Sequence, residues 1–157
     1  MIPAWLVISA IAVLVAFLMS RSDRRDNRWF QQLRRPDWLT FEWLIPIIWM
    51  TIFILGIWSA SLVWGKAPGA GETWKLMVGY LVLELLILVY TPAMFKLRSL
   101  KLGTIIGGTG FVFGLFFSLS VWPVSTLAGW LLVPYLLWSP IGTYATWVMS
   151  HLNPESA

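Results

Sequence analysis

The chain contains no cysteine, a single histidine, His151, and few charged residues, since Asp, Glu, Lys and Arg make up 11% of its 157 residues. Without cysteine it can form no disulfide, thiolate metal site or iron–sulfur cluster. One histidine argues against a zinc or haem site, so we expect no metal and no tightly bound cofactor. Soluble domains carry about 25% charged residues, and this composition therefore excludes a water-soluble globule.

Groups that could support catalysis are also scarce. The sequence shows no nucleophile beside a base, no pair of carboxylates and no phosphate-binding glycine loop. After Leu102 the only charged residue is Glu155. Acid–base hydrolysis and phosphoryl transfer would therefore lack the groups that they need, and the sequence argues against a hydrolase or an ATP-driven pump.

Hydrophobic residues are abundant, at 59%, and they lie in long runs. A transmembrane helix needs about 20 mostly apolar residues, and short connections make successive helices antiparallel neighbours. We expect an all-α membrane protein, a single five-transmembrane-helix bundle over residues 1–157, with residues 21–42 as its one long loop. The expected spans are residues 2–20, 43–64, 76–95, 103–122 and 129–150.

The positive charges predict an orientation in the membrane. Of eleven Lys and Arg residues, nine lie in the first and third connections, and only Lys66 and Lys75 lie on the opposite side. Because positive loops stay inside, we expect the N-terminus outside and the first loop and C-terminus in the cytoplasm. The chain offers no compact basic face, so we expect no nucleic acid partner. The nine residues are Arg21, Arg24, Arg25, Arg28, Arg34, Arg35, Lys96, Arg98 and Lys101.

One acidic residue, Glu84, falls near the middle of the third expected span. An ionised carboxylate there costs about 2.5 to 3.5 kcal/mol, so Glu84 must face protein or water, or be protonated. Tyr80 and Thr91 share its helical face, which could line a polar interior. Glu84 is either a ligand contact or a hydrogen-bonded packing residue.

Small residues recur along the fourth expected span at steps of three and four positions. Such a stripe lets another helix backbone approach closely. Packing inside the bundle and the seam of a homodimer both use this device, and both remain open for these residues. The stripe consists of Gly103, Gly107, Gly110, Gly114 and Ser118.

Eight of the twelve tryptophans fall into two groups. Five lie at the ends of expected spans, where aromatic belts form at the membrane interface. Trp49, Trp58 and Trp138 lie inside spans, where each could be a core residue or the wall of a ligand pocket; Phe53 and Gly142 lie one turn beyond Trp49 and Trp138. The five at span ends are Trp43, Trp64, Trp74, Trp122 and Trp130.

Two motifs resemble those of a known family. Residues 29–38 read Trp-Phe-Gln-Gln-Leu-Arg-Arg-Pro-Asp-Trp, and residues 130–138 read Trp-Leu-Leu-Val-Pro-Tyr-Leu-Leu-Trp, followed by Thr143 and Tyr144. With Trp49 and Phe53 they resemble the tryptophan-rich sensory protein family, whose mitochondrial members are called translocator protein or peripheral-type benzodiazepine receptor. The resemblance covers nearly the whole chain, and we expect a member of the bacterial type.

The resemblance implies a pocket that opens toward the first loop, which folds over it as a lid, and often a homodimer. It implies porphyrins such as protoporphyrin IX, and possibly bilins, as ligands, with sterols, other lipids or drugs in some members. It links bacterial members to tetrapyrrole homeostasis and to light and oxidative stress responses. The expected ligand residues are Trp29, Phe30 and Trp38 in the lid and Trp49, Phe53, Glu84, Tyr135, Trp138 and Gly142 in the pocket.

The sequence departs from the family pattern at two places. The first bears on how rigid the lid is, and the second bears on which ligand is bound. Thr40 and Phe41 replace a pair of prolines after the lid motif, and Glu84 stands where the family has an asparagine.

Three hypotheses follow. The first is a receptor or carrier for a tetrapyrrole that stacks on aromatic side chains. The second is a light-dependent porphyrin-degrading enzyme, with Trp49 and Trp138 as its catalytic residues; for the receptor we expect no catalytic residue. The third is a structural or regulatory membrane subunit. The sequence favours the receptor and argues against an enzyme.

Overall fold

The computed structural model describes residues 3–19 and 24–157, with side chains from Asn27 onward after the gap. Ile2 and Ser20, the expected limits of the first span, and Arg21 therefore lie outside the described residues, as do the side chains of Arg24 and Arg25. The described chain is helical and contains no strand. Its elements are α1 (Ala4–Met19), α2 (Arg24–Gln31), η1 (Glu42–Leu44), α3 (Ile45–Lys66), α4 (Gly71–Leu97), α5 (Leu100–Val121), α6 (Thr126–Leu152) and η2 (Pro154–Ser156).

The described residues thus form six α-helices, one more than the five membrane-spanning helices that we expected. The additional helix, α2, lies within the segment 21–42 that we expected to be a loop throughout. It has eight mostly polar residues and no long apolar run, which is why the search for spans passed over it. Its C-terminal aromatic residues, Trp29 and Phe30, pack against Phe95 at the end of α4.

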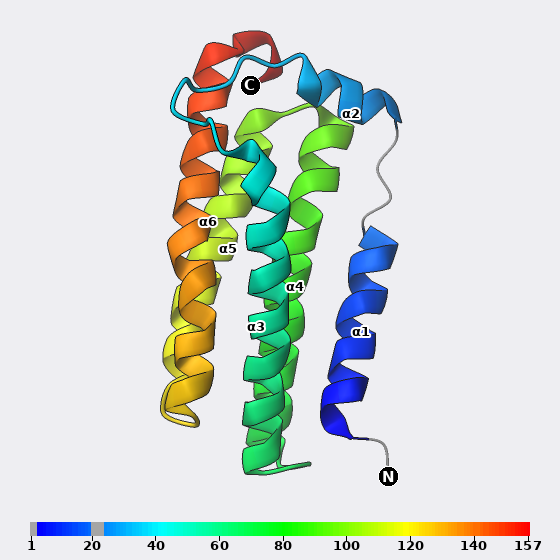
Figure 1. Cartoon of the computed structure of the whole chain (residues 1–157), viewed down its shortest axis with the longest axis vertical. Coiled ribbons are helices and arrows are strands. Elements are labelled where there is room, and N and C mark those ends of the chain that lie inside the picture. The colour runs from blue at the N-terminus through cyan, green and yellow to red at the C-terminus, as the bar shows by residue number, and fades with distance from the viewer. Residues whose placement is uncertain (1–2, 20–23) are drawn as a thin grey trace.

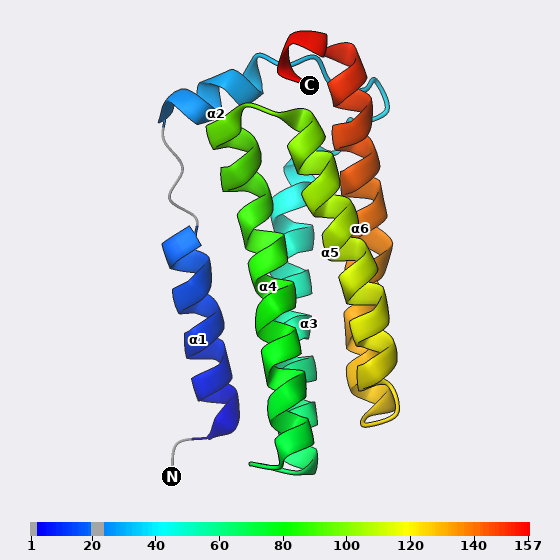
Figure 2. The ribbon, with the colours of Figure 1, turned by 180° about the vertical axis from the view of Figure 1, so that it is seen from behind.

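Four helices, α3 to α6, form a ring in which each packs against the helices that precede and follow it, with α6 closing onto α3. In Figures 1 and 2, α1 stands outside this ring, beside α3 and α4. No residue of α1 is buried. The helix is therefore an attachment to the ring rather than part of its core.

Tight connections fix the antiparallel order of the ring. Arg98 adopts a left-handed conformation with φ of 49°, which ends α4, and the Ser99 hydroxyl then accepts a hydrogen bond from the Leu102 amide at 3.2 Å. The Ser125 hydroxyl caps α6 in the same way, accepting from the Ala128 amide at 3.3 Å. Serine is a favoured N-cap because its oxygen satisfies an otherwise unpaired amide.

The glycine stripe of α5 faces the interior of the bundle. A Cβ added at any of its four glycines would meet side chains of α4 or α6, and Gly103, Gly110 and Gly114 are buried. At Gly114 the added atom would overlap the ring of Tyr135. The fourth glycine of the stripe is Gly107. The sequence left two roles open for the stripe, and this geometry serves the first of them, close packing within the bundle.

Length and composition indicate membrane-spanning helices. Three described segments are long and apolar enough to cross a bilayer: Glu42–Lys66, Gly71–Leu97 and Leu100–Val121. The apolar α1 is shorter, at 16 residues, and α6 has sufficient length but carries more polar and aromatic residues. The chain is therefore an all-α protein with helices suited to a membrane.

Tryptophan pairs mark the end of the bundle opposite α2. Trp64 and Trp74 meet edge to face across the α3–α4 turn at 5.1 Å between ring centroids, and Trp122 and Trp130 do so across the α5–α6 turn at 5.0 Å. These rings lie at helix ends, where tryptophan is favoured at a membrane interface.

Candidate functional site

A cavity of about 240 Å³ lies beneath the first loop, and we call it the loop-side cavity. Trp49 of α3, Tyr90 of α4, and Trp138 and Gly142 of α6 line it, and Phe30 of α2 closes it. Residues from all three parts of the predicted pocket (the lid, the second span and the fifth span) therefore meet around one space.

Trp138 lies deep in this site, with 9% of its surface exposed. Its indole Nε1 is buried and has no hydrogen-bond partner among the described residues. Leaving such a donor unpaired costs about 1 to 3 kcal/mol. A ligand with an acceptor atom at this position would remove that cost.

Gly142 leaves free space beside Trp138. A Cβ added at Gly142 would meet nothing within 4 Å, in contrast to the four glycines of the α5 stripe. A larger residue here would therefore occupy the cavity without displacing a neighbouring helix.

The loop is fastened to the end of α6 by hydrogen bonds. The Arg34 amide donates to Asn153 Oδ1 at 2.9 Å, and Asn153 Nδ2 donates to the Arg34 carbonyl at 3.0 Å. The Trp29 indole donates to the Ser156 hydroxyl at 3.3 Å. Figure 1 shows α2 and the loop crossing the end of the bundle where the C-terminus also lies.

Aromatic and charged contacts close the rest of the loop. Phe30 stacks on Phe95 at 4.8 Å between centroids, and the Arg35 guanidinium lies over the Phe30 ring at 5.3 Å. Arg35 also pairs with Glu42, which draws the two ends of segment 36–41 together. Phe30 is thereby held in place over the cavity.

The other two predicted lid residues do not line the cavity. Trp29 packs against Phe95 and bonds to Ser156. Trp38 is 40% exposed and stacks on Tyr144 of α6 at 6.0 Å between centroids. Both side chains fasten the loop to the bundle instead of facing the enclosed space.

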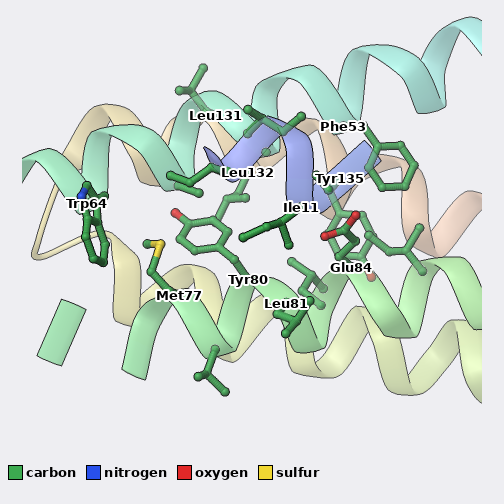
Figure 3. A pocket seen from close by; sticks show the side chains of 18 of the residues that line it. Ile11, Phe53, Trp64, Met77, Tyr80, Leu81, Glu84, Leu131, Leu132 and Tyr135 are labelled. Carbon is green, nitrogen blue, oxygen red and sulfur yellow. The ribbon is translucent and has the colours of Figure 1, made fainter. Parts of the chain in front are cut away.

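A second and larger cavity of about 490 Å³ lies between α1, α3, α4 and α6, and we call it the α1-side cavity (Figure 3). Two of the predicted site residues, Phe53 and Glu84, line this cavity and not the loop-side one. Tyr135 and Ile87 line both. The predicted site is therefore divided between two adjacent cavities that share the wall formed by these two residues.

Polar groups in the α1-side cavity are few. The Ser59 hydroxyl donates to the Ala128 carbonyl at 2.8 Å, so the Tyr80 hydroxyl donates to Ser59 at 2.6 Å. Glu84 Oε1 is buried and has no hydrogen-bond partner among the described residues. Tyr80 and Glu84 lie on one face of α4, as their spacing predicted, whereas Thr91 lines the other cavity.

Sequence reasoning missed several residues of the two sites. Phe41 contacts Trp138 edge to face at 6.4 Å and thus packs the loop against the cavity wall. Tyr90, whose hydroxyl bonds to Thr146, lines the loop-side cavity. Phe41 could have been found as an aromatic residue beside the lid motif. Ile11 and its neighbours on α1, which line the α1-side cavity, could not have been found, because their place there depends on how that helix docks.

The side chains that line the two cavities suit the binding of an apolar ligand. No group of three or more His, Cys, Asp or Glu side chains in the described part of the chain could hold a metal ion. The loop-side cavity is lined by apolar and aromatic side chains with a few hydroxyl groups. Such cavities bury apolar ligands and orient them with a few polar contacts.

The fold and the two cavities define a helical membrane protein with an aromatic-lined cavity under a fastened loop. A family model described as the TspO/MBR family matches residues 4–152, and the chain therefore belongs to the TspO/MBR family. The resemblance seen in the sequence is confirmed.

Curated relatives come from bacteria and from human. The chain is 28% identical to protein CrtK of Rhodobacter capsulatus, over 80% of this chain and 79% of that protein. It is 25% identical to the tryptophan-rich sensory protein of Cereibacter sphaeroides, over 82% and 79% respectively. It is 28% identical to the human translocator protein, over 79% and 76%.

Proposed function

We propose that this protein is a five-span integral membrane receptor or carrier that binds a porphyrin-type tetrapyrrole in the loop-side cavity. The observation that carries the proposal is the meeting of Phe30, Trp49, Trp138 and Gly142 around one cavity. Aromatic rings stack on a flat macrocycle, and an apolar enclosure favours its hydrocarbon edge over water. The names sensory protein and translocator protein, given to relatives, agree with a binding role.

The size of the cavity defines how a macrocycle would enter. Ligand pockets usually measure about 300 to 1,000 Å³, and the loop-side cavity has about 240 Å³. Binding therefore requires the loop to lift or Tyr135 to turn toward the α1-side cavity. The first of these movements would give the loop a role in admitting the ligand.

The proposed membrane arrangement adds α1 and α6 to the three spans identified by composition. The first loop and the C-terminus lie at one end of the bundle. The excess of positive charge at this end would place it in the cytoplasm by the positive-inside rule, so the proposed pocket opens toward the cytoplasmic face.

Titration with protoporphyrin IX in mild detergent, followed by quenching of tryptophan fluorescence, tests the proposal. Trp138→Phe should weaken binding by about tenfold or less, because a stacked aromatic pair contributes about 0.5 to 1.5 kcal/mol. Gly142→Phe should weaken it more, because the new ring fills the cavity. Gly108→Phe is the matched control, since Gly108 also has open space around its Cα but lines neither cavity.

The proposal fails if the parent shows no saturable quenching, and that outcome favours the structural or regulatory subunit. Equal affinity in the parent and in Gly142→Phe would mean that the ligand binds elsewhere.

A second candidate function is light-dependent porphyrin degradation, favoured by the presence of both Trp49 and Trp138 in the same cavity. Irradiation of the protein–porphyrin complex in air separates the two functions. A receptor keeps its pigment, and Trp138→Phe behaves as the parent does. A degrading enzyme loses pigment under light, and Trp138→Phe slows this loss while retaining most of the affinity.

We also propose the homodimer that the resemblance implies. Because the glycine stripe of α5 packs inside the bundle, the dimer would use another surface. Substitution at Gly107 should then lower stability while leaving the mass of the detergent-solubilised particle unchanged.

A further inference from the structure

We propose that the α1-side cavity is a second ligand site, which takes amphiphilic amines from the lipid phase and pairs their ammonium group with Glu84. This site is distinct from the tetrapyrrole site and does not depend on it. Three features of the cavity carry the inference: its size and lining, the single acid within it, and the helix that closes it.

The cavity is large enough for a small organic ligand and is mostly apolar. Its volume of about 490 Å³ falls within the range of ligand pockets. Ile52, Leu83 and Leu132 form part of its wall, and the small residues Gly56 and Ala60 leave room along α3. A hydrocarbon chain would bury its surface here without having to displace a polar group.

Glu84 supplies the one acidic group of the cavity (Figure 3). Its Oε1 atom is buried without a hydrogen-bond partner, and Glu84 takes part in neither ion pair of the described residues, which join Arg35 to Glu42 and Lys75 to Glu72. The described residues of the lining include no Lys, Arg or His. The cavity therefore has an acid without a cation, in surroundings where an ion pair is stronger than in water.

An amine is the ligand group that fits this arrangement. An ammonium group donates up to three hydrogen bonds and carries the opposite charge, and charge-assisted hydrogen bonds are about twice as strong as neutral ones. The nearby hydroxyl of Tyr80 gives its proton to Ser59, so it can offer an amine only a neutral acceptor, whereas Glu84 offers a carboxylate. A carboxylic acid ligand would place like groups together and should be rejected.

The position of α1 explains how such a ligand would arrive. Val7, Ile8 and Ile11 of α1 form one wall of the cavity, yet α1 has no buried residue and lies outside the four-helix ring. A small outward movement of α1 would open the cavity toward lipid while leaving the ring intact. An amphiphile dissolved in the bilayer could therefore enter from the side.

Photolabelling tests this site in lipid nanodiscs. The probes are three alkyl chains of equal length with a diazirine at mid-chain, ending in an amine, an alcohol or a carboxylic acid. The amine should label α1, α3 and α4 peptides saturably, at a concentration about tenfold or more below that of the alcohol, because the charged hydrogen bond is stronger. Excess unlabelled alkylamine should compete.

Substitutions distinguish the cavity from general partition into lipid. Glu84→Gln keeps the shape of the side chain and should abolish the preference for amine over alcohol. Gly56→Phe, or the smaller Gly56→Leu, should block labelling, since the space beside Gly56 is open and belongs to the cavity. Gly142→Phe, which fills the other cavity, should leave amine labelling unchanged.

The proposal is overturned if the three head groups label equally, if Glu84→Gln labels as the parent does, or if Gly142→Phe and not Gly56→Phe blocks the probe. Failure of porphyrin binding with amine labelling intact would refute the tetrapyrrole site alone.

Discussion

At the scale of single residues, Asn153 has the clearest structural role. It is 3% exposed and makes hydrogen bonds to the Arg34 amide, the Arg34 carbonyl and, at 2.9 Å, the Met149 carbonyl. Its amide side chain thus joins the loop to the end of α6.

We expect Asn153→Ala to lower the free energy of unfolding by about 1 to 3 kcal/mol, because the partly buried backbone groups of Arg34 and the buried Met149 carbonyl lose their partner. Thermal unfolding in mild detergent and the rate of tryptic cleavage in the loop measure the effect. Gln32→Ala, at an exposed loop position, should change neither. An unchanged cleavage rate in Asn153→Ala would show that other contacts suffice to hold the loop.

The glycines of α5 allow a paired prediction. Gly114→Ala should lower the midpoint of thermal unfolding, because the new methyl overlaps the Tyr135 ring and such overpacking costs about 1 to 3 kcal/mol. Gly108→Ala meets open space and should raise stability by up to about 1 kcal/mol, since alanine favours a helix. Equal shifts in the two variants would contradict the packing described here.

Residue-level prediction from the sequence worked where a residue type was exceptional for its place. A tryptophan or a glutamate inside a span stands out, and Trp49, Trp138 and Glu84 each line a cavity. Trp58, also inside a span, is an exception, because it is 52% exposed and lines neither cavity. Prediction worked less well for Trp29 and Trp38, because a motif shows which residues recur but not which way their rings point. The two cavities are separated in part by Tyr135, which lines both of them. The ring of Tyr135 packs against Gly114, where a glycine leaves space for it.

At the scale of elements, the two serine caps determine where α5 and α6 begin. Ser125→Ala should lower stability by about 1 kcal/mol, because the Ala128 amide loses its acceptor. Ser125→Asp should retain most of it. Thermal unfolding of both variants, with Ser99→Ala as a second test at the other end of the bundle, measures the contribution. If Ser125→Asp is as unstable as Ser125→Ala, the hydroxyl has a role other than capping.

The apolar runs predicted the five long helices to within a few residues, and the additional turns at their ends come from polar residues that a search for hydrophobicity omits. The same search missed α2, since its stability comes from Trp29 and Phe30 packing on α4 rather than from apolar length. The docking of α1 beside α3 and α4 could not be predicted from the sequence either, because a helix that is apolar on all sides gives no indication of which side faces its neighbours.

At the scale of the whole molecule, the arrangement predicts which segments share a side of the membrane. Single cysteines introduced at Gln32 and Glu155 should react with a membrane-impermeant thiol reagent from one side, and a cysteine at Ala70 should react from the other. All three positions are exposed, and the native chain has no cysteine to compete.

With the cytoplasmic orientation that we propose, Gln32 and Glu155 should be protected in intact cells and should react after permeabilisation. Labelling of Gln32 and Glu155 from opposite sides would contradict the bundle itself, whereas reversal of all three would contradict only its orientation.

The fastening of the loop also has a consequence for biosynthesis. Its hydrogen bonds join residues 119 and 127 positions apart in the chain. At about 5 to 20 residues per second, the segment after the loop takes on the order of ten seconds to be translated. Throughout that time the loop lacks its hydrogen-bond partners Asn153 and Ser156, and the nascent protein has no closed pocket. With the function that we propose, ligand capture would be deferred until the residues after α6 have been made, so a half-made chain would not trap a pigment.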